Sequence, residues 1–267
     1  MELNAQQVDA YREEGYVFLP DLIPMSLVDD MRSSLEDAVD AELPGKVMEQ
    51  DRETLRMIHG IHQSVPAFRQ LARHASIIEP VRQFLGTEVY IHQFKVNFKA
   101  AFDGEVWQWH QDYVYLREDD GIREPHMANA IVFLDDVNEF NGPLLVIPKS
   151  HHEGNVSTLT VEQQHSAYQD SPNWIEAMTT RLKYTVARDE VARLVDKFGI
   201  VAPKGPAGSV LFFHPNCVHG SSTNMSPFGR KIIVINFNST ENLPVAPQTP
   251  RPEFLASSDY RPIVPQH

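Results

Sequence analysis

The sequence has very little cysteine: Cys217 stands alone among 267 residues, so no intrachain disulfide can form. It also lacks any uninterrupted apolar run near the roughly 20 residues that a membrane-spanning helix needs. The first residues are polar, unlike those of a secretory signal peptide. We therefore expect a protein of the reducing cytoplasm that has no membrane partner.

Positive charge is scarce as well. The chain has 23 Lys and Arg against 36 Asp and Glu, which gives a net charge of -13. Proteins that bind nucleic acid depend on basic patches, so a nucleic acid is not expected as a partner. The hydrophobic content of 42% is typical of a globular protein, and a chain of this length can bury a core without disulfides.

The first third of the chain has the pattern of helices. Asn4 can cap a helix that runs through Glu14, and Gly15 is placed to end it. Ser26 can cap a second helix, whose apolar stripe is best explained by core packing.

From Glu88 onward the apolar residues alternate instead. One face of the run 89–99 carries Tyr90, Phe94, Val96 and Phe98, and the other carries Gln93, Lys95, Asn97 and Lys99. Further strand-like runs, each bounded by turn residues, occur at 129–134, 144–147, 209–213 and 232–237. Short strands without alternating helices predict an antiparallel sandwich or barrel rather than a parallel sheet.

The strand region contains one helical insertion, at 191–198, which Gly199 can end. After Thr240 the chain is rich in proline and cannot form a central strand. Without internal repeats, we expect one domain over residues 1–267: a helical part of about 1–85, a β core of about 86–240 and a Pro-rich tail.

The most specific local signal lies in the segment 107–112. If this segment is a strand, His110 and Asp112 project from the same face and can take adjacent positions on a divalent metal. His219 follows an apolar run and lies 107 residues beyond Asp112. Two histidines and one carboxylate form the facial triad of non-haem Fe(II) oxygenases.

Arg230 stands 11 residues after His219 and opens the apolar run 232–237. A guanidinium at a strand start can bind a carboxylate through two hydrogen bonds, such as the distal carboxylate of 2-oxoglutarate. A solvated cation at the strand end is the alternative when Arg230 is taken alone.

The stretches 89–97, 109–113, 141–145, 219–227 and 250–256 carry a resemblance that covers almost the whole chain. They are similar to the phytanoyl-CoA dioxygenase family of Fe(II)- and 2-oxoglutarate-dependent oxygenases, and to its proline-hydroxylase branch in particular. The resemblance implies a mainly β fold with flanking helices, a double-stranded β-helix (jelly roll, cupin-like). It also implies hydroxylation of free L-proline at C4, with Fe(II), 2-oxoglutarate and O2.

The resemblance assigns roles at the matching positions. Fe(II) would be held by His110, Asp112 and His219, and the distal carboxylate of 2-oxoglutarate by Arg230. The residues expected to complete the 2-oxoglutarate pocket are Gln93, Asn97 and Lys99. Related halogenases lack the metal carboxylate, so the presence of Asp112 points to hydroxylation.

The carboxylate of a free amino acid needs a cation. Lys95 matches the position of a substrate-facing arginine in ectoine hydroxylases, and Arg117 follows the metal motif closely. Trp109 and Tyr113 flank the metal ligands and are candidates for the substrate wall. A surface charge or a core aromatic is the ordinary explanation for each of these residues. We also expect that the segment 166–183 covers the active site.

Several alternatives stay open at this point. The same chemistry on L-pipecolate or another small free amino acid is the nearest, because one methylene changes binding by only about 1–3 kcal/mol. A hydroxylase of a carrier-bound amino acid and a catalytically silent metal-binding homologue are further alternatives. For the assembly we expect a monomer or a small homo-oligomer with a small-molecule substrate.

Overall fold

The computed structural model describes residues 2–156, 158–160, 173–176, 178, 182–245 and 250–266. Its helices are α1 (Ala5–Glu14), α2 (Met25–Asp40), α3 (Ile61–Ser64), α4 (Pro66–Ala72), α5 (Ala75–Leu85), α6 (Asp112–Asp120), α7 (Asn173–Glu176), α8 (Arg188–Phe198) and the 3-10 helix η1 (Ser150–Glu153). Its strands are β1 (Tyr16–Leu19), β2 (Lys46–Met48), β3 (Leu55–His59), β4 (Val89–Lys99), β5 (Trp107–His110), β6 (Met127–Phe133), β7 (Leu144–Val146), β8 (Thr158–Thr160), β9 (Tyr184–Val186), β10 (Val210–Phe213), β11 (His219–Ser221) and β12 (Arg230–Ser239).

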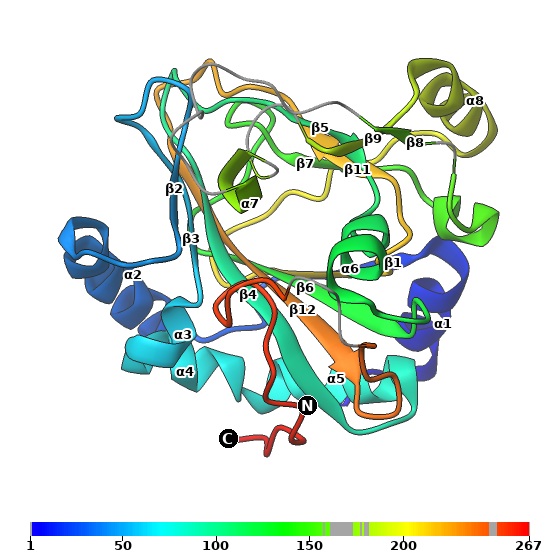
Figure 1. Ribbon diagram of the computed structural model, residues 1–267, viewed down its shortest axis with the longest axis horizontal. Coiled ribbons are helices and arrows are strands. Elements are labelled where there is room, and N and C mark those ends of the chain that lie inside the picture. Colours follow the sequence, from blue (N-terminus) through cyan, green and yellow to red (C-terminus); the bar gives the residue numbers. More distant parts are fainter. Residues whose placement is uncertain are drawn as a thin grey trace.

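Two antiparallel sheets build the β core, as the sequence predicted. The large sheet has the order β1-β10-β6-β12-β4-β3-β2, and the small sheet has the order β5-β11-β7. Helices α2 to α5 lie along the outer side of the large sheet, and the small sheet lies on its inner side (Figure 1). No helix in the described part of the chain combines the length and apolarity that a membrane span requires.

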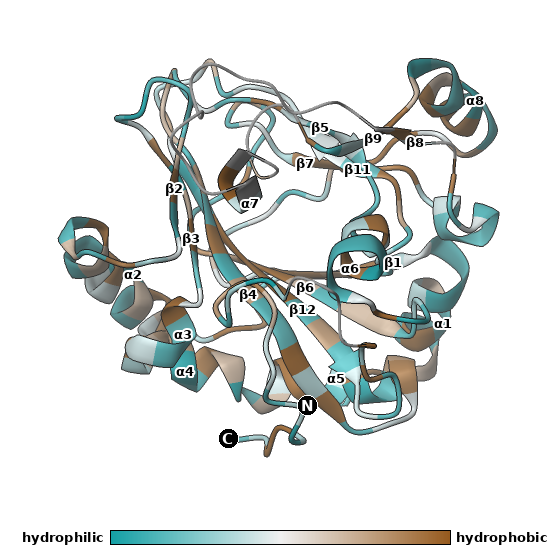
Figure 2. Ribbon diagram, viewed as in Figure 1, coloured by the Kyte–Doolittle hydropathy of each residue, from teal (hydrophilic) through white to brown (hydrophobic). Residues whose placement is uncertain are grey.

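The period of two along the central strands separates the two faces of the large sheet. The hydropathy of β4 alternates in Figure 2, whereas the middle of β12 is apolar on both faces. On β12, Ile233 and Ile235 pack into the core between sheet and helices, whereas Ile232 and Val234 pack on the inner side. The inner face of this sheet therefore carries the alternate residues of each strand, including Arg230.

The N-terminal third departs from the helical prediction in two ways. Helix α1 begins after the capping box of Asn4 and ends at Gly15, as predicted. Ser26 does not cap α2, which begins two residues earlier than predicted, because Pro24 holds φ at -57° and serves as the N-cap itself. In addition, β1, β2 and β3 lie within residues 1–85 and extend the large sheet at both edges.

A β-bulge in β4 corrects the predicted position of Tyr90. Gln93 pairs with Asn236, but Phe237 pairs with Ile91, so β4 contains one extra residue at this point. Ile91 consequently packs against the helix-side core, and the Tyr90 hydroxyl accepts a hydrogen bond from Asn238 at 2.8 Å. Phe94 and Val96 lie on the predicted side.

The Pro-rich tail contacts the end of α6 closely. Gly121 ends α6 with φ +77°, and a Cβ placed there would lie 2.2 Å from the carbonyl oxygen of Val245. Gly86 ends α5 with a similar φ of +69°, but nothing lies within 4 Å of its Cβ position. The two glycines differ in their surroundings and not in their conformation.

This pair gives a test of the tail contact. Both Gly121→Ala and Gly86→Ala impose strain of about 1–3 kcal/mol, because alanine disfavours a positive φ. Gly121→Ala must also displace the backbone at Val245, so its free energy of unfolding should fall by about 1–3 kcal/mol more than that of Gly86→Ala. Urea unfolding of both variants measures the difference. Equal losses of unfolding free energy would show that the backbone at Val245 can move without a measurable cost.

Candidate active site

Three side chains from two distant parts of the chain meet at the inner side of the small sheet. His219 on β11 pairs directly with His110 on β5, so an antiparallel register brings the two imidazoles together. The Nε2 atoms of His110 and His219 lie 3.6 and 3.8 Å from Asp112 Oδ1. The ligand atoms of all three lie within 4.8 Å of one another, which suits a single metal ion.

Hydrogen bonds fix the tautomer of both histidines. Nδ1 of His110 donates to the carbonyl of Gln108 at 2.7 Å, and Nδ1 of His219 donates to that of Cys217 at 2.9 Å. A carbonyl only accepts, so the hydrogen must be on Nδ1 and the lone pair on Nε2. The two lone pairs therefore belong to the nitrogens that face Asp112, as a divalent metal requires.

The charge states of the triad residues also suit the binding of a divalent metal. Burial lowers the pKa of His219 to about 4, so this imidazole is neutral near pH 7. Burial alone would raise the pKa of Asp112, but the two histidines, when protonated, and the Lys95 ammonium hold it below its ordinary range. Two imidazoles and one carboxylate are the donor set of a facial triad, so these residues fit Fe(II).

The sequence placed Asp112 in a strand, and this detail was wrong. Strand β5 ends at His110, and Asp112 is the first residue of α6. The carboxylate reaches the histidines from a helix start rather than by strand alternation.

A cavity extends from the triad along the inner face of the large sheet; we call it the Arg230 cavity. Its lining residues are Lys95, Asn97, Trp107, His110, Asp112, Ile131, Leu144, Phe213, His219, Ser221, Arg230, Ile232 and Val234. Arg230 is 3% exposed, and its Nε has no hydrogen-bond partner among the described residues. The same holds for Asn97 Oδ1 and Ser221 Oγ, within that part of the chain.

An unpaired buried guanidinium is costly unless an anion joins it. Burial lowers the pKa of Arg230 to about 10, so Arg230 is still charged near pH 7. The Arg230 cavity is thus lined by both a buried cation and the triad. This arrangement fits a dicarboxylate that also contacts the metal, as the sequence predicted for 2-oxoglutarate.

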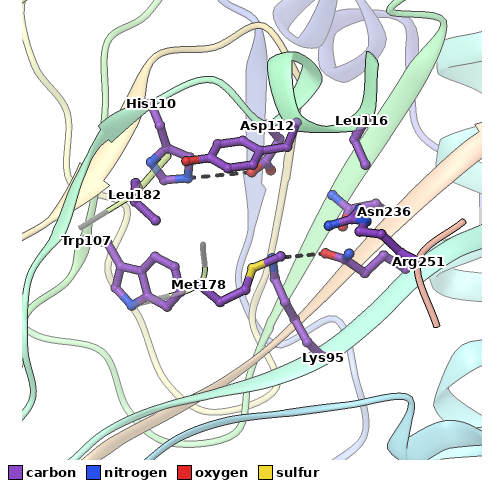
Figure 3. A pocket seen from close by; sticks show the side chains of 11 residues that line it. Lys95, Trp107, His110, Asp112, Leu116, Met178, Leu182, Asn236 and Arg251 are labelled. Carbon is purple, nitrogen blue, oxygen red and sulfur yellow. Dashed lines mark hydrogen bonds and ion pairs between the residues drawn. The ribbon is translucent and has the colours of Figure 1, made fainter. Parts of the chain in front are cut away.

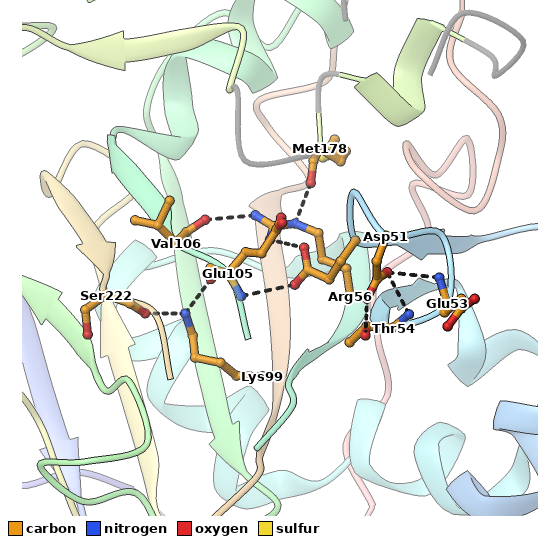
Figure 4. Close-up of polar contacts among 10 residues, drawn as sticks. Asp51, Glu53, Thr54, Arg56, Lys99, Glu105, Val106, Met178 and Ser222 are labelled. Carbon is orange, nitrogen blue, oxygen red and sulfur yellow. Dashed lines mark hydrogen bonds and ion pairs between the residues drawn. The ribbon is translucent and has the colours of Figure 1, made fainter. Parts of the chain in front are cut away.

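Of the three residues expected to complete that pocket, the structure places one in it and two elsewhere. Asn97 lines the Arg230 cavity, but Gln93 does not and instead lines a neighbouring cavity. Lys99 is not among the described lining residues of either cavity. Its amino group donates to the carbonyls of Glu105 and Ser222, because it lies at the strand end where two loops meet (Figure 4).

The neighbouring cavity, which we call the Arg251 cavity, is also bordered by His110 and Asp112 of the triad (Figure 3). Its lining residues are Gln93, Lys95, Trp107, His110, Asp112, Tyr115, Leu116, Met178, Leu182, Asn236 and Arg251. It shares Lys95, Trp107, His110 and Asp112 with the Arg230 cavity, so the two cavities meet at the triad. Figure 3 shows Arg251 and Asn236 together at one end and Trp107 and Leu182 at the other.

The predicted substrate residues are mostly elsewhere. Lys95 lines both cavities, as expected for a residue near the substrate. Tyr113 packs with Leu116 in a small apolar cluster, and its hydroxyl donates to a backbone carbonyl at 2.7 Å. Arg117 lies on the outer side of α6, where it pairs with Glu118 in solvent. Since α6 starts at Asp112, helical spacing rather than strand alternation decides which residues face inward.

A second β-bulge explains why Trp107 faces the site, whereas Trp109, next to His110 in β5, faces away from it by ordinary strand alternation. His219 pairs with His110 and Ser221 with Trp107, so β5 has three steps where β11 has two. This irregularity turns Trp107 to the side of His110. Trp109 packs instead against the apolar cluster beneath α8.

Arg56 holds two walls of the Arg251 cavity in place (Figure 4). It is fully buried, pairs with Glu49 at 2.8 Å and donates to the Met178 carbonyl at 2.9 Å. Its guanidinium also lies 3.8 Å from the centroid of the Trp107 ring. Met178 and Leu182 belong to the segment 166–183, and both line the cavity; residues 166–172, 177 and 179–181 lie outside the described part.

Several of these residues had no sequence signal. Arg251 lies in the quoted stretch 250–256, but nothing local distinguished it from a tail cation. Asn236 lies inside an apolar run, and that interruption was the only available sign.

The Arg230 cavity yields a prediction. Arg230→Met should weaken 2-oxoglutarate binding to the metal-loaded protein by about 10- to 100-fold, because a charge-assisted pair of hydrogen bonds is lost. Metal affinity should be unchanged. Calorimetric titration under anaerobic conditions measures the affinities for 2-oxoglutarate and for the metal. The control is Lys231→Met, because the ammonium of Lys231 pairs with Asp135 at 2.8 Å. Equal 2-oxoglutarate affinity in the two variants would remove the role of Arg230.

Comparisons with known proteins agree with this geometry. The family model described as Phytanoyl-CoA dioxygenase (PhyH) matches residues 11–232. L-proline trans-4-hydroxylase from Streptomyces griseoviridis is 35% identical over 99% of this chain and 98% of that protein. Ectoine dioxygenase from Halomonas elongata is 31% identical over 95% of this chain and 76% of that protein.

Solved structures show the same relation. The structure of EctD from S. alaskensis with 2-oxoglutarate and 5-hydroxyectoine superimposes with a TM-score of 0.81 at 29% identity and covers 99% of this chain and 87% of that one. The same enzyme with bound Fe gives a TM-score of 0.81 at 28% identity over the same shares of the two chains. The chain therefore belongs to the phytanoyl-CoA dioxygenase family of iron- and 2-oxoglutarate-dependent oxygenases.

Proposed function

We propose that this protein hydroxylates free L-proline at C4 to trans-4-hydroxy-L-proline, with Fe(II), 2-oxoglutarate and O2 and with release of succinate and CO2. The observation that carries the substrate is the Arg251 cavity, which joins a cation at one end to apolar walls beside the triad. A small amino acid with an apolar ring complements both parts. The similarity to L-proline trans-4-hydroxylase over 99% of the chain supports the same substrate.

His110, Asp112 and His219 would hold the iron through two neutral imidazoles and one carboxylate oxygen. When bound, iron and 2-oxoglutarate supply the oxidative chemistry that places an oxygen atom from O2 on an unactivated carbon. The chain contributes orientation and a dry site. Arg230 pairs with the distal carboxylate of 2-oxoglutarate, and the apolar lining of Ile131 and Phe213 keeps water from that pocket.

Arg251 is the residue that we assign to the substrate carboxylate. Its Nε donates to Asp120 Oδ1 at 2.6 Å and its Nη2 to Oδ2, so Asp120 fixes the plane of the guanidinium. His92 Nε2 contacts the same carboxylate at 2.8 Å, which holds Asp120 in turn. Nη1 of Arg251 has no hydrogen-bond partner among the described residues and is available to a ligand.

The ring of proline would then extend from Arg251 toward the triad. Trp107, Leu116, Met178 and Leu182 supply apolar surface on this path. A carboxylate anchored at one end and a ring held against apolar walls limit which carbon reaches the metal, which is how the site would select one C–H bond.

The test is succinate production by the purified protein with Fe(II), 2-oxoglutarate and O2. L-proline, L-pipecolate and ectoine are compared, with product identification by NMR; ectoine is included because ectoine dioxygenases are also similar to this chain. We expect one succinate for each trans-4-hydroxy-L-proline formed. Product from ectoine or L-pipecolate without product from L-proline would overturn the substrate. Bound iron without succinate from any of the three would point to a carrier-bound substrate or a silent homologue.

Arg251 and Arg117 form a matched pair for the substrate assignment. Arg251→Met should lower kcat/KM for L-proline by about 10- to 100-fold, mainly through KM, because a hydrogen bond to a charged group contributes about 1.5–3 kcal/mol. Arg117→Met should leave kcat/KM unchanged, since Arg117 lies in solvent beside Glu118. Steady-state kinetics in L-proline decide the point: a loss in Arg117→Met, or none in Arg251→Met, would contradict the assignment.

A further inference from the structure

Two buried amides link the triad to the Arg251 cavity. Asn129 on β6 and Asn236 on β12 stand directly opposite each other in the large sheet. Their exposures are 0% and 1%, and their neighbours on the inner face include Ile131 and Val234. Burying an amide in such surroundings is costly unless its hydrogen bonds are satisfied. The hydrogen-bond partners of these two side chains therefore indicate what each amide does.

The carboxylate of Asp112 determines how both amides are oriented. Asp112 Oδ2 can only accept, so the group 2.7 Å from it is Nδ2 of Asn129. Oδ1 of Asn129 then faces Asn236 and accepts from its Nδ2 at 2.6 Å. This leaves Oδ1 of Asn236, a pure acceptor, on a side chain that lines the Arg251 cavity.

The bond to Asn129 also decides how Asp112 can meet a metal. Oδ2 is engaged by the amide, while Oδ1 is the oxygen 3.6 and 3.8 Å from the two histidines. Asp112 begins a helix and has no strand neighbours to hold its carboxylate in place. The amide supplies that support and leaves one oxygen for coordination.

We propose that Asn129 is a positioning residue that keeps Asp112 a one-oxygen ligand, and that Asn236 supplies the acceptor for the protonated amine of the substrate. The second part rests on the proposed function, because it needs an amino-acid substrate. Arg251 and Asn236 lie at the same end of the cavity (Figure 3) and so present a cation and an acceptor to the two charges of a zwitterion. Since neighbouring hydrogen bonds polarise one another, an ammonium at Asn236 strengthens the chain that ends at Asp112.

Asn238 provides the matched control. It lies two residues from Asn236 on β12, is fully buried, and donates to the Tyr90 hydroxyl at 2.8 Å and to the Asn242 carbonyl at 2.7 Å. Asn238→Ala therefore removes a buried amide of the same strand without touching the chain to Asp112.

The first experiment titrates Co(II) into the protein and its Asn129→Ala and Asn238→Ala variants, and records the visible spectrum of each complex. Outer hydrogen bonds to metal ligands typically contribute about 10- to 100-fold in affinity, so Asn129→Ala should bind Co(II) that much more weakly and with an altered spectrum. Asn238→Ala should match the unmodified protein in both. Unchanged binding by Asn129→Ala, or an equal loss in the two variants, would overturn the positioning role.

The second experiment concerns the amine. Asn236→Ala should raise KM for the amino-acid substrate about tenfold, because a hydrogen bond to a charged group is lost. Adding the substrate to the Co(II) protein should shift the spectrum of the unmodified chain and not that of Asn236→Ala. A KM equal to that of Asn238→Ala would overturn this part. The Co(II) titration contains no amino acid, so its result does not depend on whether L-proline is the substrate.

Discussion

The antiparallel pairing of β11 with β5 is the interaction on which the site depends. Its register sets His219 opposite His110, although the two residues are far apart in sequence. The backbone then completes the arrangement, because carbonyls two residues before each histidine fix Nδ1 as the donor. Asp112 joins them from the next turn of chain, where β5 gives way to α6. A shift of one residue in this pairing would turn one imidazole to the opposite face of the sheet and remove the triad.

The inner face of the large sheet carries buried charged side chains, which the interior of a protein usually excludes. Lys95 and Arg230 are buried on this face. Arg56, which is also buried, pairs with Glu49 and supports the cavity walls. Arg230 makes no ion pair of this kind among the described residues, and its Nε has no hydrogen-bond partner there, so a ligand is the natural source of compensation. The sheet thus gives up stability at this position, and the binding of a dicarboxylate would recover it.

Alternation and spacing predicted the main strands of the β core and the three triad residues, but not the helical position of Asp112 or the strands β1, β2 and β3 in the N-terminal third. They predicted the polar face of β4 and the long separation of His219 from Asp112, because a period of two and an antiparallel return leave clear marks in a sequence. They failed at the two bulges, where one extra residue turned Tyr90 and Trp107 to the unexpected side. They also gave no sign of the role of Arg251. This tail residue is held at the cavity by its hydrogen bonds to Asp120, which is distant in sequence. Local pattern cannot report a contact made across the fold.

The central claim is that the two cavities hold 2-oxoglutarate and L-proline on either side of one metal. The most direct measurement is a crystal structure of the protein under anaerobic conditions with Fe(II), 2-oxoglutarate and L-proline. The account predicts iron bound by His110, Asp112 and His219, a carboxylate on Arg230 and the proline carboxylate on Arg251. It further predicts that C4 is the proline carbon nearest the metal. Proline bound with its carboxylate away from Arg251, or with another carbon nearest the iron, would contradict the account.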